Sequence, residues 1–342
     1  MKFEDVLVIK NGRNQRAVEN PQGRYPIYGS GGIMGYADDY ICKADTVVIG
    51  RKGSINNPLF VKEPFWNVDT AFGLEADRSV LLPMYLFYFC RHFDFERLNK
   101  AVTIPSLTKS DLLKIEIDVP DLRIQQSLVE RLSSIEGIIQ LRKQQLVELD
   151  NLVKARFVEM FGEPTTNSKN WKRVRFDSLC ENLDGKRRPI TSTDREAGPY
   201  PYYGASGIVD HVAGFIFDED ILLVSEDGAN LLARSTPIAF SISGKVWVNN
   251  HAHVLRFNNF ALQKYVEYYF SMISIEDYIT GSTQPKLNQA KLNSMMIPLP
   301  SDSLQEIFMR FIAEVDKSKA VVQKALDEAQ TLFDSLMQQY FG

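Results

Sequence analysis

The sequence predicts an α/β (α+β) protein built as a tandem duplication, with two mixed α/β globular domains that are each followed by a long helix. Three observations predict it. A run of about 40 residues in the middle of the chain has the periodicity of a single helix. A similar run ends the chain, and the segments before the two runs repeat each other's motifs. The 342 residues therefore divide into a first domain at 1–120, a first helix at 121–162, a second domain at 163–300 and a second helix at 301–342.

The first long helix is predicted over residues 121–162. Its apolar residues recur three and four positions apart from 128 to 160, which traces one narrow helical face, with Arg142 as the one polar residue on it. Asp121 suits the N-cap, and Gly162, just before a proline, suits the end. Forty residues give a helix of about 60 Å. Because so narrow a stripe would leave its leucines in water, this helix needs a helical partner.

The partner is predicted at the C-terminal end of the sequence. Apolar residues from 304 to 336 again step by four and three, with Ser318 as the polar interruption, and Leu332 and Leu336 continue the stripe. Two copies of one unit tend to pack with twofold symmetry. We therefore expect an antiparallel intramolecular coiled coil with pseudo-twofold symmetry. Parallel packing, or two independent helices on separate bodies, is the alternative.

The repeated motifs keep their order and nearly constant spacing. Segment 25–33 is matched by 200–208 at a displacement of 175, and the Pro-x-Leu loop 105–107 by 285–287 at 180. Trp66 and Trp247 match at 181, so the second copy carries an insertion near residues 231–237. In each copy we expect a glycine- and tyrosine-rich loop, short strands, a helix, the Pro-x-Leu loop and a last strand at 115–120 or 295–300.

Composition limits the possible classes of protein. Hydrophobic content of 44% and charged content of 24% are ordinary for a soluble globular protein. No apolar run approaches the roughly 20 residues that span a bilayer, and the first residues lack the apolar core of a signal peptide, so we expect a cytoplasmic protein without a membrane. A net charge of −4 argues against nucleic acid, but a nearly neutral domain can still present a basic face. The three cysteines are expected to be buried free thiols.

Motifs for catalysis or cofactor binding are incomplete in this sequence. Segment 57–60 lacks the second proline of the adenine methyltransferase tetrapeptide, and the glycines of 29–35 lack the strand and helix of a nucleotide-binding loop. No phosphate-binding loop for ATP occurs, and no lysine completes a magnesium nuclease site. His251 and His253 are spaced as neighbours on one strand face, but no third ligand is near them in sequence. We therefore expect neither metal nor catalysis.

Candidate binding residues lie in loops that both copies share, where packing does not require them. Segment 51–54 offers cations, a hydroxyl and backbone amides suited to phosphates and guanine edges. Its counterpart contains Glu226 and Asp227, which reverse the charge and could accept a hydrogen bond from cytosine. A shared catalytic site would resist that reversal, whereas two sites reading different sequences would not. For the basic and Pro-x-Leu positions, a plain solvated loop is the alternative.

The candidate set for DNA binding comprises these loop positions in both copies. Its members are Arg13, Asn14, Tyr28, Gly29, Ser30, Arg51, Lys52, Ser54, Thr108, Lys109, Lys186, Arg187, Arg188, Tyr203, Gly204, Ser206, Glu226, Asp227, Lys286 and Asn288.

The ordered set of motifs resembles the specificity subunit of type I restriction-modification systems. It consists of Tyr-Pro-x-Tyr-Gly-x-x-Gly, a later strand and glycine loop, Pro-x-Leu, a strand ending in proline, and Gln-Gln or Gln-Glu opening a long helix, in both copies. The resemblance implies target recognition domains that each read half of a bipartite double-stranded DNA site. It implies spacer helices that dock two DNA adenine methyltransferase subunits and, with them, motor-nuclease subunits. It also implies no catalysis by this chain, with S-adenosylmethionine, ATP and magnesium expected only on partner subunits.

Two alternatives stay open at this point. One is the specificity chain of a combined type II restriction-methylation enzyme, which the neighbouring coding sequences would distinguish. The other is a coiled-coil scaffold whose globular domains bind protein or sugar. Retention of a methyltransferase and of DNA would exclude the scaffold.

Overall fold

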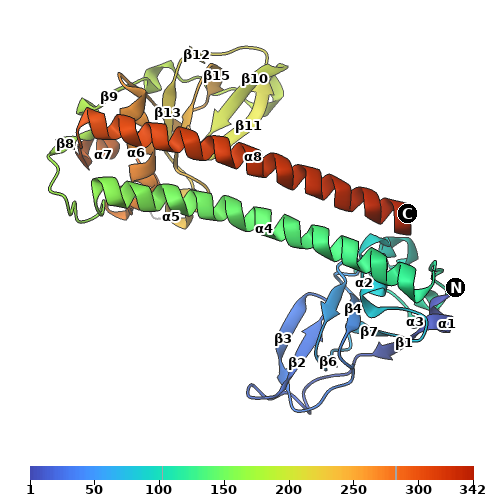
Figure 1. Cartoon of the computed structure of the whole chain (residues 1–342). Coiled ribbons are helices and arrows are strands. Elements are labelled where there is room, and N and C mark those ends of the chain that lie inside the picture. The colour runs from blue at the N-terminus through green and yellow to red at the C-terminus, as the bar shows by residue number, and fades with distance from the viewer. Residues whose placement is uncertain (102, 282) are drawn as a thin grey trace. The chain divides into compact units, whose positions relative to one another are not determined.

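The computed structural model of the chain describes residues 1–101, 103–281 and 283–342 (Figure 1). The chain divides into two compact units, of which unit 1 combines residues 1–143 with 323–342 and unit 2 spans residues 144–322. Each unit holds one globular part and a segment of each long helix. We call the part before the first long helix the first globule and the part between the long helices the second globule. Within the described residues no helix is long and apolar enough to cross a membrane.

The first globule is a mixture of short strands and helices. Its elements are α1 (Phe3–Val6), β1 (Leu7–Asn11), β2 (Tyr25–Gly29), β3 (Gly32–Ala37), β4 (Thr46–Gly50), β5 (Leu59–Val61), β6 (Trp66–Asn67), β7 (Ala71–Ala76), α2 (Pro83–His92) and α3 (Lys109–Leu112). One antiparallel sheet has the order β1-β7-β4-β5, and a smaller sheet has the order β3-β2-β6. All five residues of β4 are buried, as expected for an apolar strand with neighbours on both sides.

The second globule repeats this plan with more strands. Its elements are β8 (Arg173–Arg175), β9 (Cys180–Asn182), β10 (Ala197–Gly204), β11 (Gly207–Val212), β12 (Phe217–Asp218), β13 (Ile221–Ser225), α5 (Asn230–Ala233), β14 (Ala239–Ile242), β15 (Lys245–Val248), β16 (Ala252–Phe257), α6 (Phe260–Met272), α7 (Gln289–Ser294) and β17 (Met296–Pro298). Its sheets have the orders β14-β13-β16-β9, β11-β10-β15-β12 and β17-β8.

The two globules share their strand pairing. The order β14-β13-β16-β9 matches β5-β4-β7-β1 strand for strand. In both, a hairpin of tyrosine- and glycine-rich strands makes a parallel pair with a strand that carries tryptophan, with Ile27 opposite Trp66 and Tyr202 opposite Trp247. Helix α5 lies in the expected insertion of the second copy. The predicted duplication of a mixed α/β fold is confirmed.

The two long helices are α4 (Leu122–Phe161) and α8 (Asp302–Phe341), each of 40 residues. The Asp121 carboxylate accepts the backbone N–H groups of Arg123 and Ile124, as an N-cap does. Gly162 ends α4 with a φ of 83°, a left-handed conformation that glycine adopts without strain. The sequence signals for both ends of this helix are therefore confirmed.

In unit 2 the helix segments run antiparallel. The rings of Phe157 and Phe308 lie 5.5 Å apart, and Asp150 of α4 forms a 2.6 Å ion pair with Lys319 of α8. Residue numbers thus rise along one helix as they fall along the other. Phe157 and Phe308 are buried with the apolar residues of α6, so the helix pair and the second globule share one core.

In unit 1 the pairing has the same direction. Tyr88 of α2 packs on Phe333 of α8 and donates a 2.6 Å hydrogen bond to Glu136 of α4. One turn earlier in α2, Tyr85 packs on Phe341 and donates to the Asp118 carbonyl, just before α4. The first globule therefore contacts both helix segments through the aromatic residues of α2.

Two sequence predictions about local structure were wrong. Ser318 and Leu332 were placed on the buried face of α8, but both are exposed, and Phe333 and Lys319 take the inward positions. Two apolar stripes one position apart fit the helical period over this segment, so spacing alone did not separate them. The predicted strand at 115–120 is reduced to one bridge between Lys2 and Glu116, because α1 begins at Phe3 and ends the extended partner.

Candidate nucleic-acid interface

The candidate residues of the first globule gather in one loop cluster. We call it the first loop cluster, made of residues 12–16, 29–31, 51–54 and 105–109. The Pro-x-Leu loop is joined to the loop after β4 by two backbone hydrogen bonds, from Gly53 N–H to Pro105 O at 3.0 Å and from Leu107 N–H to Arg51 O at 2.9 Å. A Cβ at Gly50 would lie 2.3 Å from the Ser54 carbonyl oxygen, so this close approach requires glycine.

The turn between β6 and β7 connects the other segments of this cluster. Arg13 N–H donates to Asn67 O at 2.9 Å, and Arg51 N–H donates to Thr70 O at 2.8 Å. Val68 N–H donates to the carbonyl of Tyr28 at the end of β2, which brings the hairpin to the same turn. Segments far apart in sequence are thus held on one backbone framework.

The second globule builds the equivalent second loop cluster, made of residues 184–188, 204–206, 225–228 and 285–288. Gly228 N–H donates to Pro285 O at 3.1 Å and Leu287 N–H to Glu226 O at 2.8 Å, which repeats both bonds of the Pro-x-Leu loop. Asn249 N–H donates to Tyr203 O at 3.0 Å, which repeats the bond to the hairpin. The backbone of the cluster is therefore conserved between the two globules, whatever side chains it carries.

Side chains of the first cluster are mostly exposed. Arg13, Asn14, Arg51 and Lys52 all reach solvent. The Arg51 guanidinium lies 5.8 Å from the centre of the Phe72 ring and donates a 3.4 Å hydrogen bond to the Asp69 carbonyl, which orients it without covering it. Exposed cations on a glycine-containing loop suit an anionic backbone such as that of DNA.

The Pro-x-Leu residues also have structural partners. The Thr108 hydroxyl accepts the Asp111 N–H and caps α3, while the Asn288 carboxamide accepts the Lys291 N–H and caps α7. Lys109 donates a 2.8 Å hydrogen bond to the Ile9 carbonyl of β1. These candidates therefore shape the loop as well as line it.

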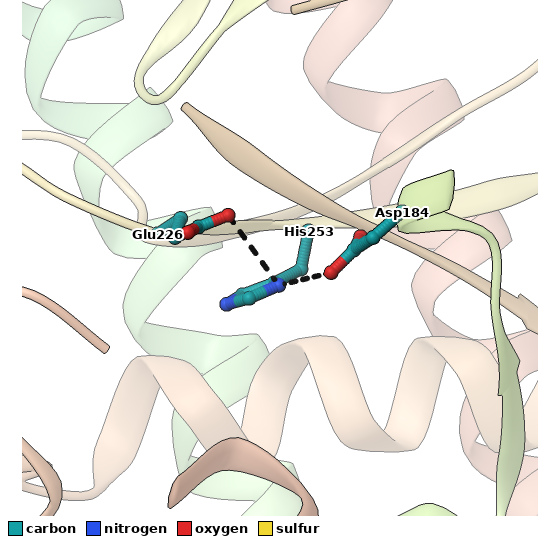
Figure 2. Close-up of side chains that lie close together, drawn as sticks. All are labelled: Asp184, Glu226 and His253. Carbon is teal, nitrogen blue, oxygen red and sulfur yellow. Dashed lines mark hydrogen bonds and ion pairs between the residues drawn. The ribbon is translucent and has the colours of Figure 1, made fainter. Parts of the chain in front are cut away.

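The second cluster contains a charge network that the sequence did not predict. The side chains of Arg187 and Glu226 are only 14% and 12% exposed and form a 2.6 Å ion pair. Lys286 binds the second carboxylate oxygen of Glu226 at 3.1 Å. Asp184 and the fully buried His253 complete the network, and Figure 2 shows the carboxylates of Asp184 and Glu226 on either side of the imidazole.

The electrostatics of this network favour ionised carboxylates. Burial alone would raise the pKa of Glu226, but the hydrogen bonds from Arg187 and Lys286 and the charge of His253 hold it below its ordinary value. Burial likewise opposes ionisation of Asp184, but the hydrogen bond from His253 brings its pKa below the ordinary range. Both carboxylates therefore carry charge at neutral pH.

The two tyrosines beside the hairpin glycines are half-buried. Burial raises the pKa of Tyr28, with a further contribution from Glu63, and burial raises that of Tyr203. Both phenols therefore stay neutral at physiological pH. The ring of Tyr28 packs edge-on against Phe65, with the ring centres 5.3 Å apart, so part of the Tyr28 ring is buried in the core.

The remaining positions divide by exposure. Gly29 and Gly204 are buried backbone, and Ser30, Asp227 and Asn288 are half-buried. The exposed positions among the candidates are Arg13, Asn14, Arg51, Lys52, Ser54, Thr108, Lys186, Arg188, Ser206 and Lys286.

Over the residues that the structure describes, the cysteines and histidines do not converge on a separate reactive centre. His251 pairs with Asp227 at 3.0 Å and His253 with Asp184, so the two histidines do not converge as metal ligands. Among the described residues, one group of carboxylate and histidine atoms lies within 4.8 Å, that of Asp184, Glu226 and His253. Both oxygens of Glu226 already bind cationic side chains, so this group is an ion-pair network.

The three thiols are free. Cys42 and Cys90 are buried as predicted, whereas Cys180 is half-buried. Burial raises the pKa of Cys42 and of Cys180 to about 12, far above the range in which a thiolate acts as a nucleophile.

Comparisons with known proteins point to one family. The family model described as the type I restriction modification DNA specificity domain matches residues 1–151 and 168–330. A putative type I restriction enzyme specificity subunit from Haemophilus influenzae is 30% identical over 142 residues, 42% of this chain. A putative MjaX specificity subunit from Methanocaldococcus jannaschii is 21% identical over 296 residues, 76% of this chain and 69% of that protein. The match spans only 36% of the length of the Haemophilus relative.

Solved structures show the same fold. The S subunit of a type I restriction-modification system from M. genitalium superposes with a TM-score of 0.63 at 17% identity, covering 100% of this chain and 95% of that one. A chain from a structural study of type I complex assembly and conformational transition has a TM-score of 0.61 at 15% identity, with 100% and 96% covered. With one matched region in each half, the chain belongs to the type I restriction-modification DNA specificity domain family.

Proposed function

We propose that this chain is the non-catalytic specificity subunit of a type I restriction-modification complex, in which each globule reads one half of a bipartite double-stranded DNA site. The observation that carries the proposal is the pair of loop clusters. Leu107 N–H to Arg51 O and Leu287 N–H to Glu226 O are the same bond in two places, yet the side chains at these positions have opposite charge. One framework with two different sets of side chains is suited to reading two different sequences.

The exposed loop residues would make the DNA contacts. Lys52, Lys186 and Lys286 are suited to phosphates, and Arg13, Arg51 and Arg188 to phosphates or to the paired acceptors of guanine. Tyr28 and Tyr203 would offer neutral aromatic surface next to the glycine turns. Arg187 and Glu226, which bind each other, would instead support the loops that carry the contacts.

The long helices would set the distance between the half-sites. In this proposal residues 1–120 and 163–300 are the target recognition domains, and residues 121–162 and 301–342 are the spacer. A helix of 40 residues is about 60 Å long, which corresponds to at most about 17 base pairs. The unread gap would be shorter, because each half-site occupies part of that length.

The helices would also provide the docking surface for two DNA adenine methyltransferase subunits and, with them, the motor-nuclease subunits. Large apolar side chains lie exposed on both helices, including Leu141 at 66%, Val147 at 56% and Val321 at 70% exposed. Such exposure suits a protein interface. S-adenosylmethionine, ATP and magnesium would bind to the partner subunits.

The test is to sequence the methylated positions in cells that carry this chain with its cognate methyltransferase. Deleting residues 140–146 and 320–326 together removes one heptad from each helix and preserves the pairing register. We expect the half-sites to be unchanged and the gap to shorten by about 3 base pairs, since seven residues span about 10 Å. Changed half-sites with an unchanged gap would refute the spacer role.

A domain exchange is the matched control. Replacing residues 1–115 with the globule of another family member should change one half-site only. If both half-sites changed, the globules would not read DNA independently.

A further inference from the structure

The second globule buries an ionisable side chain among its loops. His253, near the start of β16, has a side chain that is 1% exposed. Its Nδ1 lies 2.6 Å from Asp184 Oδ2 and 3.8 Å from Glu226 Oε2 (Figure 2). Its Nε2 lies 2.8 Å from the backbone carbonyl oxygen of Leu287. Both ring nitrogens therefore have an acceptor within reach.

The identity of these acceptors determines the protonation of the ring. A backbone carbonyl only accepts, so the bond to Leu287 requires a hydrogen on Nε2. Asp184 already accepts from Asn182 and Val254 and pairs with Arg187, contacts that suit an ionised carboxylate. An ionised carboxylate opposite Nδ1 requires a second ring hydrogen. The geometry is therefore that of an imidazolium which donates two hydrogen bonds.

The surrounding charges suit a cationic ring. Asp184 and Glu226 face it directly. Arg187 binds the same two oxygens, Asp184 Oδ2 at 3.5 Å and Glu226 Oε2 at 2.6 Å, and Lys286 binds Glu226 Oε1 at 3.1 Å. A metal ion among these atoms would have to displace the two cations from Glu226. With both ring nitrogens of His253 protonated, each of these polar groups therefore has a partner without a metal ion.

The ring also connects three segments of the second loop cluster. Its two hydrogen bonds reach Asp184 in the 184–188 segment and Leu287 in the Pro-x-Leu loop, and its charge faces Glu226 in the loop after β13. None of these segments is a neighbour of another in sequence. Loss of the Nδ1 proton would remove the hydrogen bond to Asp184 and leave a ring lone pair against its carboxylate.

We propose that His253, as an imidazolium, is a positioning residue of the second globule, and that its deprotonation loosens recognition of the second half-site alone. This inference rests on the proposed function. It goes further in making one half of the DNA recognition sensitive to pH.

The first globule serves as an internal control. With the displacement of 181 between the copies, Phe72 is the residue of the first globule equivalent to His253, and its ring lies under the Arg51 guanidinium. Phenylalanine does not titrate, so this contact is the same at every pH of interest. Recognition of the first half-site should therefore lack the pH dependence of the second.

The experiment uses the full chain with its cognate methyltransferase subunits and three DNA duplexes, one intact, one altered in the first half-site and one in the second. Affinities are compared from about pH 6 to about pH 9. Discrimination at the second half-site should fall by about tenfold at the alkaline end. Discrimination at the first half-site should stay constant.

Two variants separate the role of His253 from a general effect. His253→Gln should lose discrimination at the second half-site at all pH values. His211→Gln, which alters an exposed histidine of β11 outside the second loop cluster, should behave as the wild type. The pH profile of the wild type needs no variant and tests the proposal even where His253→Gln does not fold. An equal pH dependence at both half-sites overturns the inference, as does a zinc-dependent rise of the melting temperature that His253→Gln abolishes.

The outcomes also distinguish this inference from the proposed function. If the wild type does not discriminate either altered duplex, the chain does not read DNA and the proposed function fails. If it discriminates both but shows no pH dependence at the second, the proposed function stands and only the role of His253 fails.

Discussion

The joint between each globule and its following helix offers a test in which the duplication supplies the control. Gln125, in the first turn of α4, is fully buried and makes three hydrogen bonds. Its amide oxygen accepts the Leu82 N–H at 2.8 Å, and its amide nitrogen donates to Val80 O at 2.8 Å and to Pro120 O at 2.7 Å. The side chain thus joins the start of α2 to the start of α4.

The equivalent residue of the second copy is less well bonded. Gln305 is also fully buried, but within the described part of the chain its amide nitrogen donates only to Pro300 O at 2.9 Å. Its amide oxygen has no hydrogen-bond partner among the residues that the structure describes. The same residue at the same place therefore has three bonds in one copy and one in the other.

We expect Gln125→Met to destabilise unit 1 by about 3 kcal/mol, at about 1 kcal/mol for each lost hydrogen bond, with more where the orphaned backbone groups stay dry. Gln305→Met should cost unit 2 about 1 kcal/mol or less, because it also removes a buried oxygen that lacks a partner. Methionine keeps the length of the side chain, which limits any cavity.

The assay is amide hydrogen exchange of the full chain, read at α2 for unit 1 and at α6 for unit 2, because two units need not unfold as one. The exchange-derived opening free energy should fall at α2 in Gln125→Met and change little at α6 in Gln305→Met. Equal losses in the two variants would show that these hydrogen bonds do not determine the stability of the joint.

Three further predictions concern the buried carboxylates, the end of α4 and the first loop cluster. The pKa values of Asp184 and Glu226 are lowered in the folded state, so their stabilising contribution is complete above the ordinary carboxyl range and is lost on acidification. Unit 2 should therefore lose stability below about pH 4, and the loss should be less steep in Asp184→Asn. Denaturant titrations at several pH values measure this. Gly162→Ala should lower the stability by about 1 kcal/mol or more, because φ is positive at this position and a Cβ would clash. Gly137→Ala, at an open position within α4, should raise the stability by about 1 kcal/mol. Shifts of the melting temperature in the same direction in both variants would contradict this. Lys52→Ala should reduce the salt dependence of DNA affinity by about one released counterion, while a lysine variant on α8 leaves it unchanged, as fluorescence titrations at several salt concentrations would show.

Much of the fold was predictable because the sequence contains its own comparison. A short apolar run such as β4 is ambiguous alone, but the same run with the same following glycine loop in a second copy removes the ambiguity. The helix ends were also local signals, an aspartate cap and a glycine stop. The inward face of α8 was not, because Ser318 and Lys319 are separated by one position and only the contact with Asp150 decides between them.

The site was predictable as a set of loops but not as a set of roles. Repetition of the glycine turn and the Pro-x-Leu loop marked the segments that meet. Spacing gave no sign that Arg187 and Glu226 bind each other, since they are 39 residues apart and belong to different segments. His253 was considered only with His251, although its partner Asp184 lies 69 residues away. Such pairs are created by the strand order β13-β16-β9, which brings the three segments together.

The first globule has Arg51 where the second has Glu226, and this reversal of charge requires different neighbouring residues in the two globules. Glu226 is buried with Arg187, Lys286 and His253 around it. A buried carboxylate without such partners would be strongly disfavoured, so an acid at this position requires its cations.

The first globule shows the other solution at the same positions. By the displacements of 173 and 180, Asn14 and Ser106 stand where the second globule has Arg187 and Lys286, and neither could compensate an acid at position 51. The exposed Arg51 needs no such set, since it rests on Phe72 and reaches solvent. A single exchange of Arg51 for glutamate would therefore place an acid there without the arginine, lysine and histidine that surround Glu226, whereas an exchange of the whole globule carries its network with it. Divergence of the two loop clusters is thus expected to proceed by whole sets of residues on a constant backbone.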